Sequence, residues 1–141
     1  MKAEMYAEPS EALIAENAII FQRFEENGVD LRQKLSFEFT IEFPSKQDAE
    51  AFMDQARALM RLIEADHGLG KSDATLFCDE DEDLVDVTYS VAAKAEVRLI
   101  SMIEQTLGNL AADHGGSECF WEFPDPANAE LSANSVEELK Q

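Results

Sequence analysis

The chain has few cysteines and no long apolar run, and each shortage excludes a class of protein. Two cysteines among 141 residues are too few for a disulfide-rich scaffold. No stretch approaches the roughly 20 apolar residues that a membrane helix needs. The longest early apolar run, residues 18–21, is too short for a signal peptide. We therefore expect reduced thiols, a cytoplasmic location and no membrane partner.

Basic residues are also scarce. Eleven Lys and Arg stand against 30 Asp and Glu, which gives a formal net charge of −19. Direct contact with DNA, RNA or an anionic membrane requires Lys and Arg, so this balance disfavours it. The charge favours a basic protein partner, or serves solubility alone.

The clearest pattern is a strand followed directly by a helix, over residues 36–63. Apolar and polar residues alternate in the strand, which gives it one apolar face. The apolar residues are Phe37, Phe39, Ile41 and Phe43. Pro44 ends the strand because it cannot donate to a sheet ladder, and Ser45 with Asp48 predicts a helix start. Apolar residues then recur at spacings of three and four up to Ile63, so the strand and the helix can bury each other's apolar faces.

The other segments predict an α+β protein of ferredoxin-like build. A helix is expected over residues 10–27, strands at 74–78 and 84–89, a helix capped by Ser90 with an apolar stripe from Ala95, and a last strand at 117–123. Without the first helix the order is βαββαβ, which predicts a four-stranded antiparallel sheet with two helices on one face. The first helix has a broad apolar side and must dock on the domain or on a second copy. We expect one domain over residues 9–124, a flexible N-terminus 1–8 and a polar tail 125–141.

Two histidines and two cysteines are the first candidates for chemistry. His67 and His114 each follow an Asp at the end of a predicted helix, and we expect both at the same end of the helical layer. Their positions suit the helix dipole, and no metal-ligand spacing surrounds them, so no metal site is predicted. Cys78 and Cys119 are expected on opposite edges of the sheet, too far apart for a disulfide, and buried as apolar residues.

An acidic run is the next candidate. Asp79, Asp81 and Asp83 imitate the first half of a calcium loop. The Gly and Glu that such a loop requires at its sixth and twelfth positions are replaced by Leu84 and Ser90. We expect a solvated turn or an acidic docking loop. No nucleophile triad, phosphate loop or nucleotide motif occurs, so neither an enzyme nor a cofactor is predicted.

The sheet face turned away from the helices is the candidate functional surface. The alternation that turns Leu76, Val85, Val87, Tyr89, Cys119, Trp121 and Phe123 towards the helices also turns acidic residues outward. The outward acids are Glu38, Glu42, Asp86, Glu118 and Glu122, accompanied by Thr40, Thr88 and the apolar exceptions Phe77 and Phe120. RNA-recognition modules on a similar sheet need basic residues here, so nucleic acid would be repelled.

Two interpretations of this face remain open. It is a solvated surface, or one covered by the first helix or a second subunit. Alternatively, it is a docking surface for an Arg- and Lys-rich partner. In that case Phe77 and Phe120 are apolar anchors, and Asp79, Asp81 and Asp83 attract the partner.

Over about residues 14–124 the chain resembles the family called regulator of ribonuclease E activity B. The resemblance lies in Glu26–Asp30, in the strand 37–43 with the helix start 45–50, and in Gly115-Gly116 before Glu118-Cys119-Phe120-Trp121. Where the family often has Tyr-Asp-Gly-Trp, this chain has Cys119 and Phe120 before Trp121, and its tail is only mildly acidic. The resemblance implies a small, acidic, non-enzymatic cytoplasmic protein that binds the basic scaffold region of the ribonuclease and lowers RNA cleavage.

Two other function classes stay open. One is an immunity-type or nucleic-acid-mimicking inhibitor of another basic protein. The other is a ferredoxin-like small-molecule binder or enzyme, often a homodimer through its sheets. A concave apolar pocket with a titratable group of perturbed pKa would favour the second class.

Overall fold

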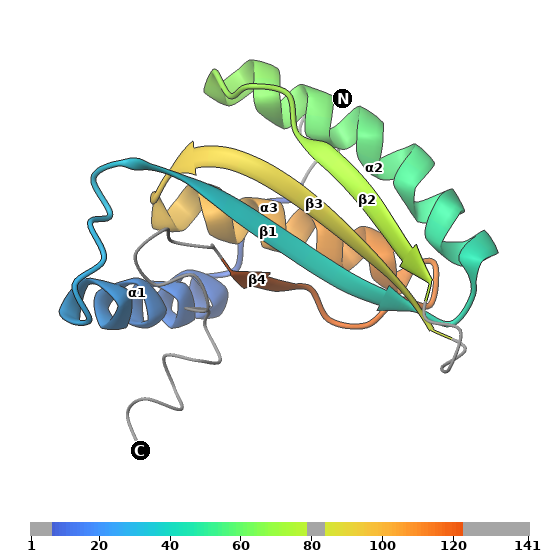
Figure 1. Ribbon diagram of the computed structural model, residues 1–141, viewed down its shortest axis with the longest axis horizontal. Coiled ribbons are helices and arrows are strands. Elements are labelled where there is room, and N and C mark those ends of the chain that lie inside the picture. The colour runs from blue at the N-terminus through green and yellow to red at the C-terminus, as the bar shows by residue number, and fades with distance from the viewer. Residues whose placement is uncertain (1–6, 79–83, 123–141) are drawn as a thin grey trace.

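The computed structural model describes residues 7–78 and 84–122, and its elements alternate as the sequence predicts (Figure 1). In chain order they are α1 Glu11–Glu26, β1 Lys34–Phe43, α2 Lys46–His67, β2 Asp73–Cys78, β3 Val85–Lys94, α3 Val97–Ala112 and β4 Phe120–Glu122. The strands form one sheet in the order β2-β3-β1-β4, with every neighbouring pair antiparallel. The two long central strands, β1 and β3, run antiparallel, and each is followed by a helix. The predicted ferredoxin-like α+β fold is confirmed.

The β1–α2 unit forms as its sequence predicts. Ser45 caps α2, because its Oγ accepts a hydrogen bond of 3.1 Å from the backbone N–H of Asp48. Gly68 ends α2 in the left-handed conformation, at φ 64°. The two apolar faces meet in the core, where the rings of Phe43 and Phe52 lie 4.9 Å apart. The predicted strand and helix are both confirmed.

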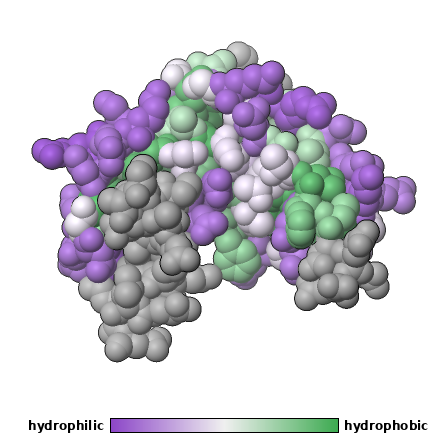
Figure 2. Space-filling view, in the orientation of Figure 1, coloured by the Kyte–Doolittle hydropathy of each residue, from purple (hydrophilic) through white to green (hydrophobic). Residues whose placement is uncertain are grey.

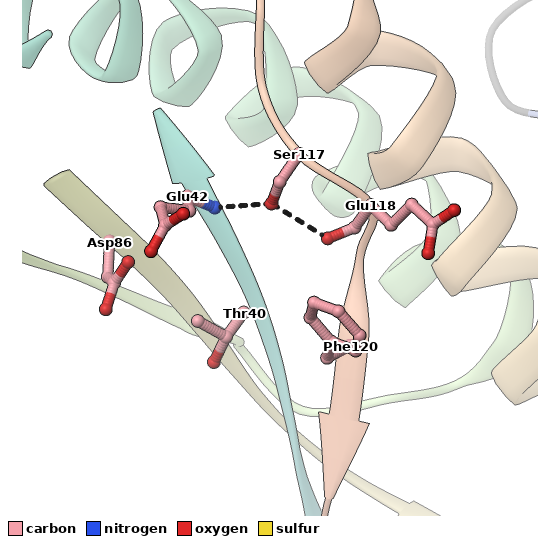
Figure 3. Close-up of a pocket in the computed structure, with 6 residues that line it drawn as sticks. All are labelled: Thr40, Glu42, Asp86, Ser117, Glu118 and Phe120. Carbon is pink, nitrogen blue, oxygen red and sulfur yellow. Dashed lines mark hydrogen bonds between the residues drawn. The ribbon is translucent and has the colours of Figure 1, made fainter. Parts of the chain in front are cut away.

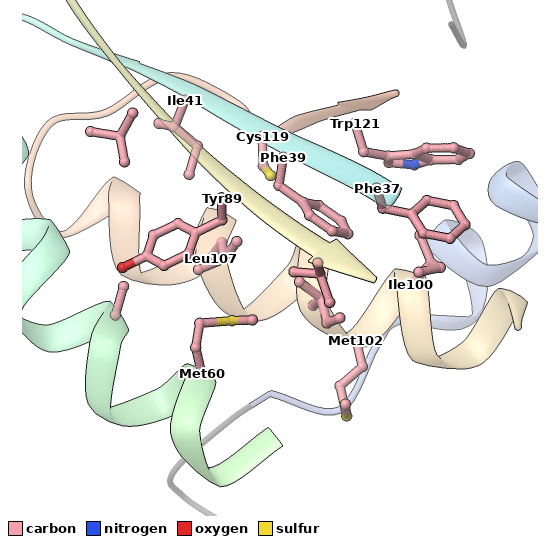
Figure 4. Close-up of a cluster of buried hydrophobic side chains, with 14 of the residues drawn as sticks. Phe37, Phe39, Ile41, Met60, Tyr89, Ile100, Met102, Leu107, Cys119 and Trp121 are labelled. Atoms are coloured by element: carbon pink, nitrogen blue, oxygen red, sulfur yellow. The ribbon is translucent and has the colours of Figure 1, made fainter. Parts of the chain in front are cut away.

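Helix α1 docks on the helical side of the sheet, beside α3 and beneath β4. The ring of Trp121 in β4 lies edge-on to Phe21 at 5.4 Å and tilted to Phe24 at 6.0 Å. Phe37 of β1 completes this aromatic cluster, 5.7 Å from Trp121. Figure 4 shows Phe37 and Trp121 within the wider core under the sheet. Helix α1 therefore does not cover the opposite face of the sheet, which the described residues leave open.

The structure corrects the boundary between the third strand and the third helix. Strand β3 continues to Lys94, so Ser90 lies within a strand, opposite Glu38 of β1, and caps no helix. The alternation of buried residues simply continues through Val91 and Ala93, and ten residues of β1 are available to pair with it. Helix α3 begins only after Glu96, so Ala95 precedes it.

Strand β4 is shorter than predicted. It spans Phe120–Glu122, and residues 117–119 lead into it without ladder pairing. Ser117 nevertheless follows the end of β1, since its backbone N–H donates to the Glu42 carbonyl at 2.8 Å. Phe123, which the sequence places in this strand, lies outside the described residues.

The two histidines lie at opposite ends of the helical layer, so the prediction that they share one end was wrong. His67 lies beside Lys34 and Leu99, where β1 and α3 begin. His114 follows the end of α3 and precedes Gly116, which lies against Phe43 at the other end of β1. The reason is topological: α2 follows β1 and α3 follows β3, and because these strands are antiparallel the helices run in opposite directions.

Cys78 ends the edge strand β2, Cys119 directly precedes the opposite edge strand β4, and both cysteines are free. Cys119 is buried as predicted, whereas Cys78 is exposed, so the prediction that both are buried was wrong for Cys78. Strand β2 is an edge strand, and its last two residues, Phe77 and Cys78, are both exposed.

Candidate docking surface

Towards the Phe43 end of β1, the open face of the sheet carries three rows of side chains set by the strand register. Across β2, β3, β1 and β4 the first row is Asp73, Ser90, Glu38 and Glu122; the second is Thr75, Thr88, Thr40 and Phe120; the third is Phe77, Asp86 and Glu42. Ser117 and Glu118 flank Glu42 where the chain approaches β4. We call these residues the acidic face. The five outward carboxylates predicted from the sequence all belong to it.

Like charges stand directly opposite each other on this face. Glu42 pairs with Asp86 across β1 and β3, and Glu38 pairs with Glu122 across β1 and β4. Cross-strand pairs of like charge destabilise a sheet rather than support it. Only the middle row is neutral, where the hydroxyls of Thr40 and Thr88 lie 3.0 Å apart.

The chain's own cations do not neutralise the acidic face within residues 7–78 and 84–122. The arginine ion pairs there join Arg32 to Asp30, Arg57 to Asp54, Arg61 to Glu64 and Arg98 to Glu8, all away from this face. Two lysines do lie on the same side of the sheet, but at its far end, where Lys34 stands opposite Lys94. The face is therefore polarised along the strands, with carboxylates at the Phe43 end of β1 and lysines at the Lys34 end.

A hollow of about 450 Å³ lies in the acidic face, and we call it the Phe120 hollow (Figure 3). It is lined by Thr40, Glu42, Asp86, Ser117, Glu118 and Phe120. In Figure 3 the carboxylates of Glu42 and Asp86 lie on one side and the Phe120 ring on the other, while the Glu118 carboxylate points outward. Ser117 links Glu42 to Glu118 at the edge of the hollow, because its Oγ accepts a hydrogen bond from the Glu42 N–H at 2.9 Å and donates one to the Glu118 carbonyl at 3.0 Å.

Two large apolar side chains are exposed on this face. Phe77 on β2 is 64% exposed and Phe120 on β4 is 55% exposed. Phe77 stands directly opposite Asp86, and Phe120 stands opposite Thr40, one row from Glu42. Figure 2 shows that apolar side chains interrupt the polar surface in separate places rather than as one continuous patch. The sequence analysis had named both residues as the apolar exceptions on the acidic face.

A buried polar cluster that the sequence analysis missed lies under β4. The Asn17 amide of α1 donates to Ser101 Oγ at 3.0 Å and to Glu104 Oε1 at 2.9 Å, and Trp121 Nε1 donates to Asn17 Oδ1 at 3.1 Å. Burial raises the pKa of the Glu104 carboxyl to about 7, against the hydrogen bond from Asn17, and the nearby charge of Glu16 raises it further. A polar Asn within the apolar stripe of the first helix was the only signal in the sequence.

The described residues contain neither a metal-binding cluster nor an activated Cys119. No group of three His, Cys, Asp or Glu side chains within them could hold a metal ion. Burial raises the pKa of the Cys119 thiol well above its usual value, which opposes formation of a nucleophilic thiolate. Asp79, Asp81 and Asp83 fall outside the described residues. None of the helices in the described part of the chain is long and apolar enough to cross a membrane.

The fold and its surface define the class of this protein: a ferredoxin-like α+β protein whose most distinctive feature is an open, acidic sheet face. A family model described as regulator of ribonuclease activity B matches residues 14–122. The chain belongs to this family, which is one of regulatory proteins, and the resemblance found in the sequence is confirmed. Comparisons with curated proteins and with solved structures returned no significant match.

Proposed function

We propose that this protein is a cytoplasmic, non-enzymatic regulator that uses its acidic face to bind a basic protein partner. The family description names ribonuclease activity, so we propose that the partner is the basic scaffold region of ribonuclease E, with RNA cleavage lowered as the result. The observation that carries this proposal is the set of like-charged carboxylates that no cation of the described residues pairs with. Such an arrangement costs stability in the isolated protein and gains attraction when a cationic segment lies across it.

The charge distribution also indicates how such a partner would arrive. A net charge of −19 attracts a polycationic segment over a distance of about 8 Å at physiological ionic strength. Exposed charges of this kind mainly increase the association rate and the salt dependence of binding, rather than the lifetime of the complex. The exposed aromatic rings are the groups that can add contact energy once the partner is bound.

An RNA-cleavage assay with purified full-length ribonuclease E tests the proposal. The wild-type protein is expected to lower the cleavage rate, and a variant with Glu42→Gln, Asp86→Asn and Glu118→Gln is expected to lower it much less. The matched control carries Glu11→Gln, Glu25→Gln and Glu50→Gln, three exposed acids of α1 and α2, and changes the net charge equally. Equal inhibition by both variants would contradict the acidic face as the binding surface, and no inhibition by the wild type would contradict the function.

Ionic strength provides a second test of the same proposal. Binding of the two purified proteins, measured by calorimetry, should weaken strongly between 50 mM and 500 mM salt because exposed charges are screened. Affinity that is independent of salt would contradict an electrostatic interface. Wild-type capture of a different basic protein, with ribonuclease E unaffected, would instead support the immunity-type alternative.

A further inference from the structure

The Glu42–Asp86 pair is the most unusual point on the acidic face. The two carboxylates stand directly opposite each other, and no cation from the described residues pairs with either. Two exposed aromatic rings flank them: Phe77 is the cross-strand neighbour of Asp86 on one side, and Phe120 lies diagonally beside Glu42 on the other. Diagonal neighbours in a sheet are about 7–8 Å apart, which is within reach of an aromatic side chain.

We propose that the Phe120 hollow receives an arginine side chain of the basic partner, with its guanidinium between the Glu42 and Asp86 carboxylates and the Phe120 ring. This inference rests on the proposed function, since it specifies how the acidic face recognises its partner. The hollow, of about 450 Å³, is large enough for one long side chain to enter from an extended segment lying across the strands.

Arginine fits this arrangement better than lysine for a geometric reason. The guanidinium is planar, so it can stack on an aromatic face while its N–H groups point in fixed directions to two carboxylates. The ammonium of lysine is compact, strongly hydrated and has no flat surface to stack. A site with carboxylates alone would distinguish arginine from lysine poorly. The Phe120 ring therefore produces the expected preference for arginine.

Charge complementarity excludes the other obvious occupants of this face. A second copy of the chain would bring another −19 of net charge, so the two copies would repel each other as they approach. Nucleic acid would bring phosphates to Glu42 and Asp86, which repel them. The lysines at the far end of the face, Lys34 and Lys94, further limit the cationic part of the partner to the end where β1 reaches Phe43.

Two synthetic peptides test the preference for arginine. Acetylated and amidated (Gly-Arg-Ser)₄ and (Gly-Lys-Ser)₄ carry the same charge and are titrated into the full-length protein at 50 mM salt, by calorimetry and by amide chemical shifts. The Arg peptide is expected to bind about 2–5-fold more tightly, the range that an exposed cation–π contact provides. Its largest shifts are expected at Thr40 and Phe120, with little change at Lys34 and Lys94.

Variants separate stacking from charge. Phe120→Ala is expected to remove most of the preference for the Arg peptide and Phe120→Tyr to retain it, while Glu42→Gln with Asp86→Asn weakens both peptides. Ile19→Ala, which removes a similarly exposed apolar side chain from α1, is the control and should change neither the affinities of the two peptides nor the preference for arginine. Phe120 is more than half exposed, and a thermal melt of each variant confirms that it is folded.

The outcomes distinguish this inference from the proposed function. Equal affinities for the two peptides, or an unchanged preference in Phe120→Ala, would overturn the arginine site while inhibition of ribonuclease E could still stand. A Phe120-dependent preference without any effect on RNA cleavage would instead overturn the proposed function and leave the site intact. Shifts centred on Lys34 and Lys94 would overturn the placement.

Discussion

Replacing Glu104 by Gln should stabilise this protein at alkaline pH and not at acidic pH. Glu104 of α3 accepts a hydrogen bond from Asn17 of α1 and has Glu16 and Glu118 as like-charged neighbours. Its pKa rises from 4.5 in the unfolded chain to about 7 in the folded protein, chiefly because burial disfavours the charged form. The folded state therefore binds more protons than the unfolded state between these values, and stability falls as the pH rises through this window.

The magnitude follows from the shift in the pKa. A shift from 4.5 to about 7 corresponds to an upper limit of roughly 3 kcal/mol lost by pH 8. Because the side chain keeps some contact with solvent, we expect about 1–3 kcal/mol after screening is allowed for. Gln is nearly the same shape and can still accept the Asn17 hydrogen bond, but it does not titrate.

Urea unfolding of both proteins at pH 5, 6, 7 and 8 measures this effect. The chain has a single tryptophan, and because Trp121 belongs to the same polar cluster its fluorescence reports on the site directly. The difference between the two free energies of unfolding should be smallest at pH 5 and grow up to pH 8, with Glu104→Gln the more stable. Other titrating groups cancel in the difference. A constant difference across the whole range, or a variant less stable at pH 8, would refute the reasoning.

Three further substitutions test the structure. Burial alone would raise the pKa of Glu64, but hydrogen bonds from Ser72 and Arg61 lower it below its usual value. Glu64→Gln should therefore lower the free energy of unfolding by about 1–3 kcal/mol at pH 7. This loss should shrink as the pH falls below about 4.5, which denaturant titrations at pH 7 and below pH 4.5 would show. Gly116→Ala should lower the melting temperature by several degrees, since a Cβ there would lie 2.7 Å from the Phe43 ring and overpacking costs about 1–3 kcal/mol; an unchanged melt would show that the ring yields freely. Ser45→Ala removes the α2 cap and should lower the free energy of unfolding by about 1 kcal/mol. Ser36→Ala, which removes an exposed hydroxyl from β1, serves as its control in the same calorimetric scan.

The parts of the fold that the sequence predicts well are those with strong local signals. The alternation from Phe37 to Phe43 predicts the start of β1 to within two residues, and Pro44 with Ser45 predicts the junction of β1 and α2 as observed. The error at Ser90 shows where local signals mislead, because a serine before an apolar helix is also compatible with a strand. Pairing with β1 decided between the two, and it kept Ser90 in the ladder.

The acidic face was predictable for a similar reason. A period of two assigns every strand residue to one of two faces, so the outward position of Glu38, Glu42 and Asp86 needs no knowledge of the strand order. Which acids stand opposite each other does need it, because the order β2-β3-β1-β4 and the register are set by contacts far apart in the chain. Asp73 was missed for a simpler reason: β2 begins one residue earlier than predicted.

The sequence by itself determined the alternation of strands and helices, the apolar face of each, the excess of negative charge and the family. These properties depend on neighbours a few residues apart, whose spacing is written directly in the chain. Only the tertiary structure decided where α1 docks, that the two histidines lie apart, that Glu104 is buried against Asn17, and that Glu42 faces Asp86 beside an exposed Phe120. Each of these depends on residues brought together across the chain, and packing of the whole core selects among arrangements that local sequence leaves equally possible.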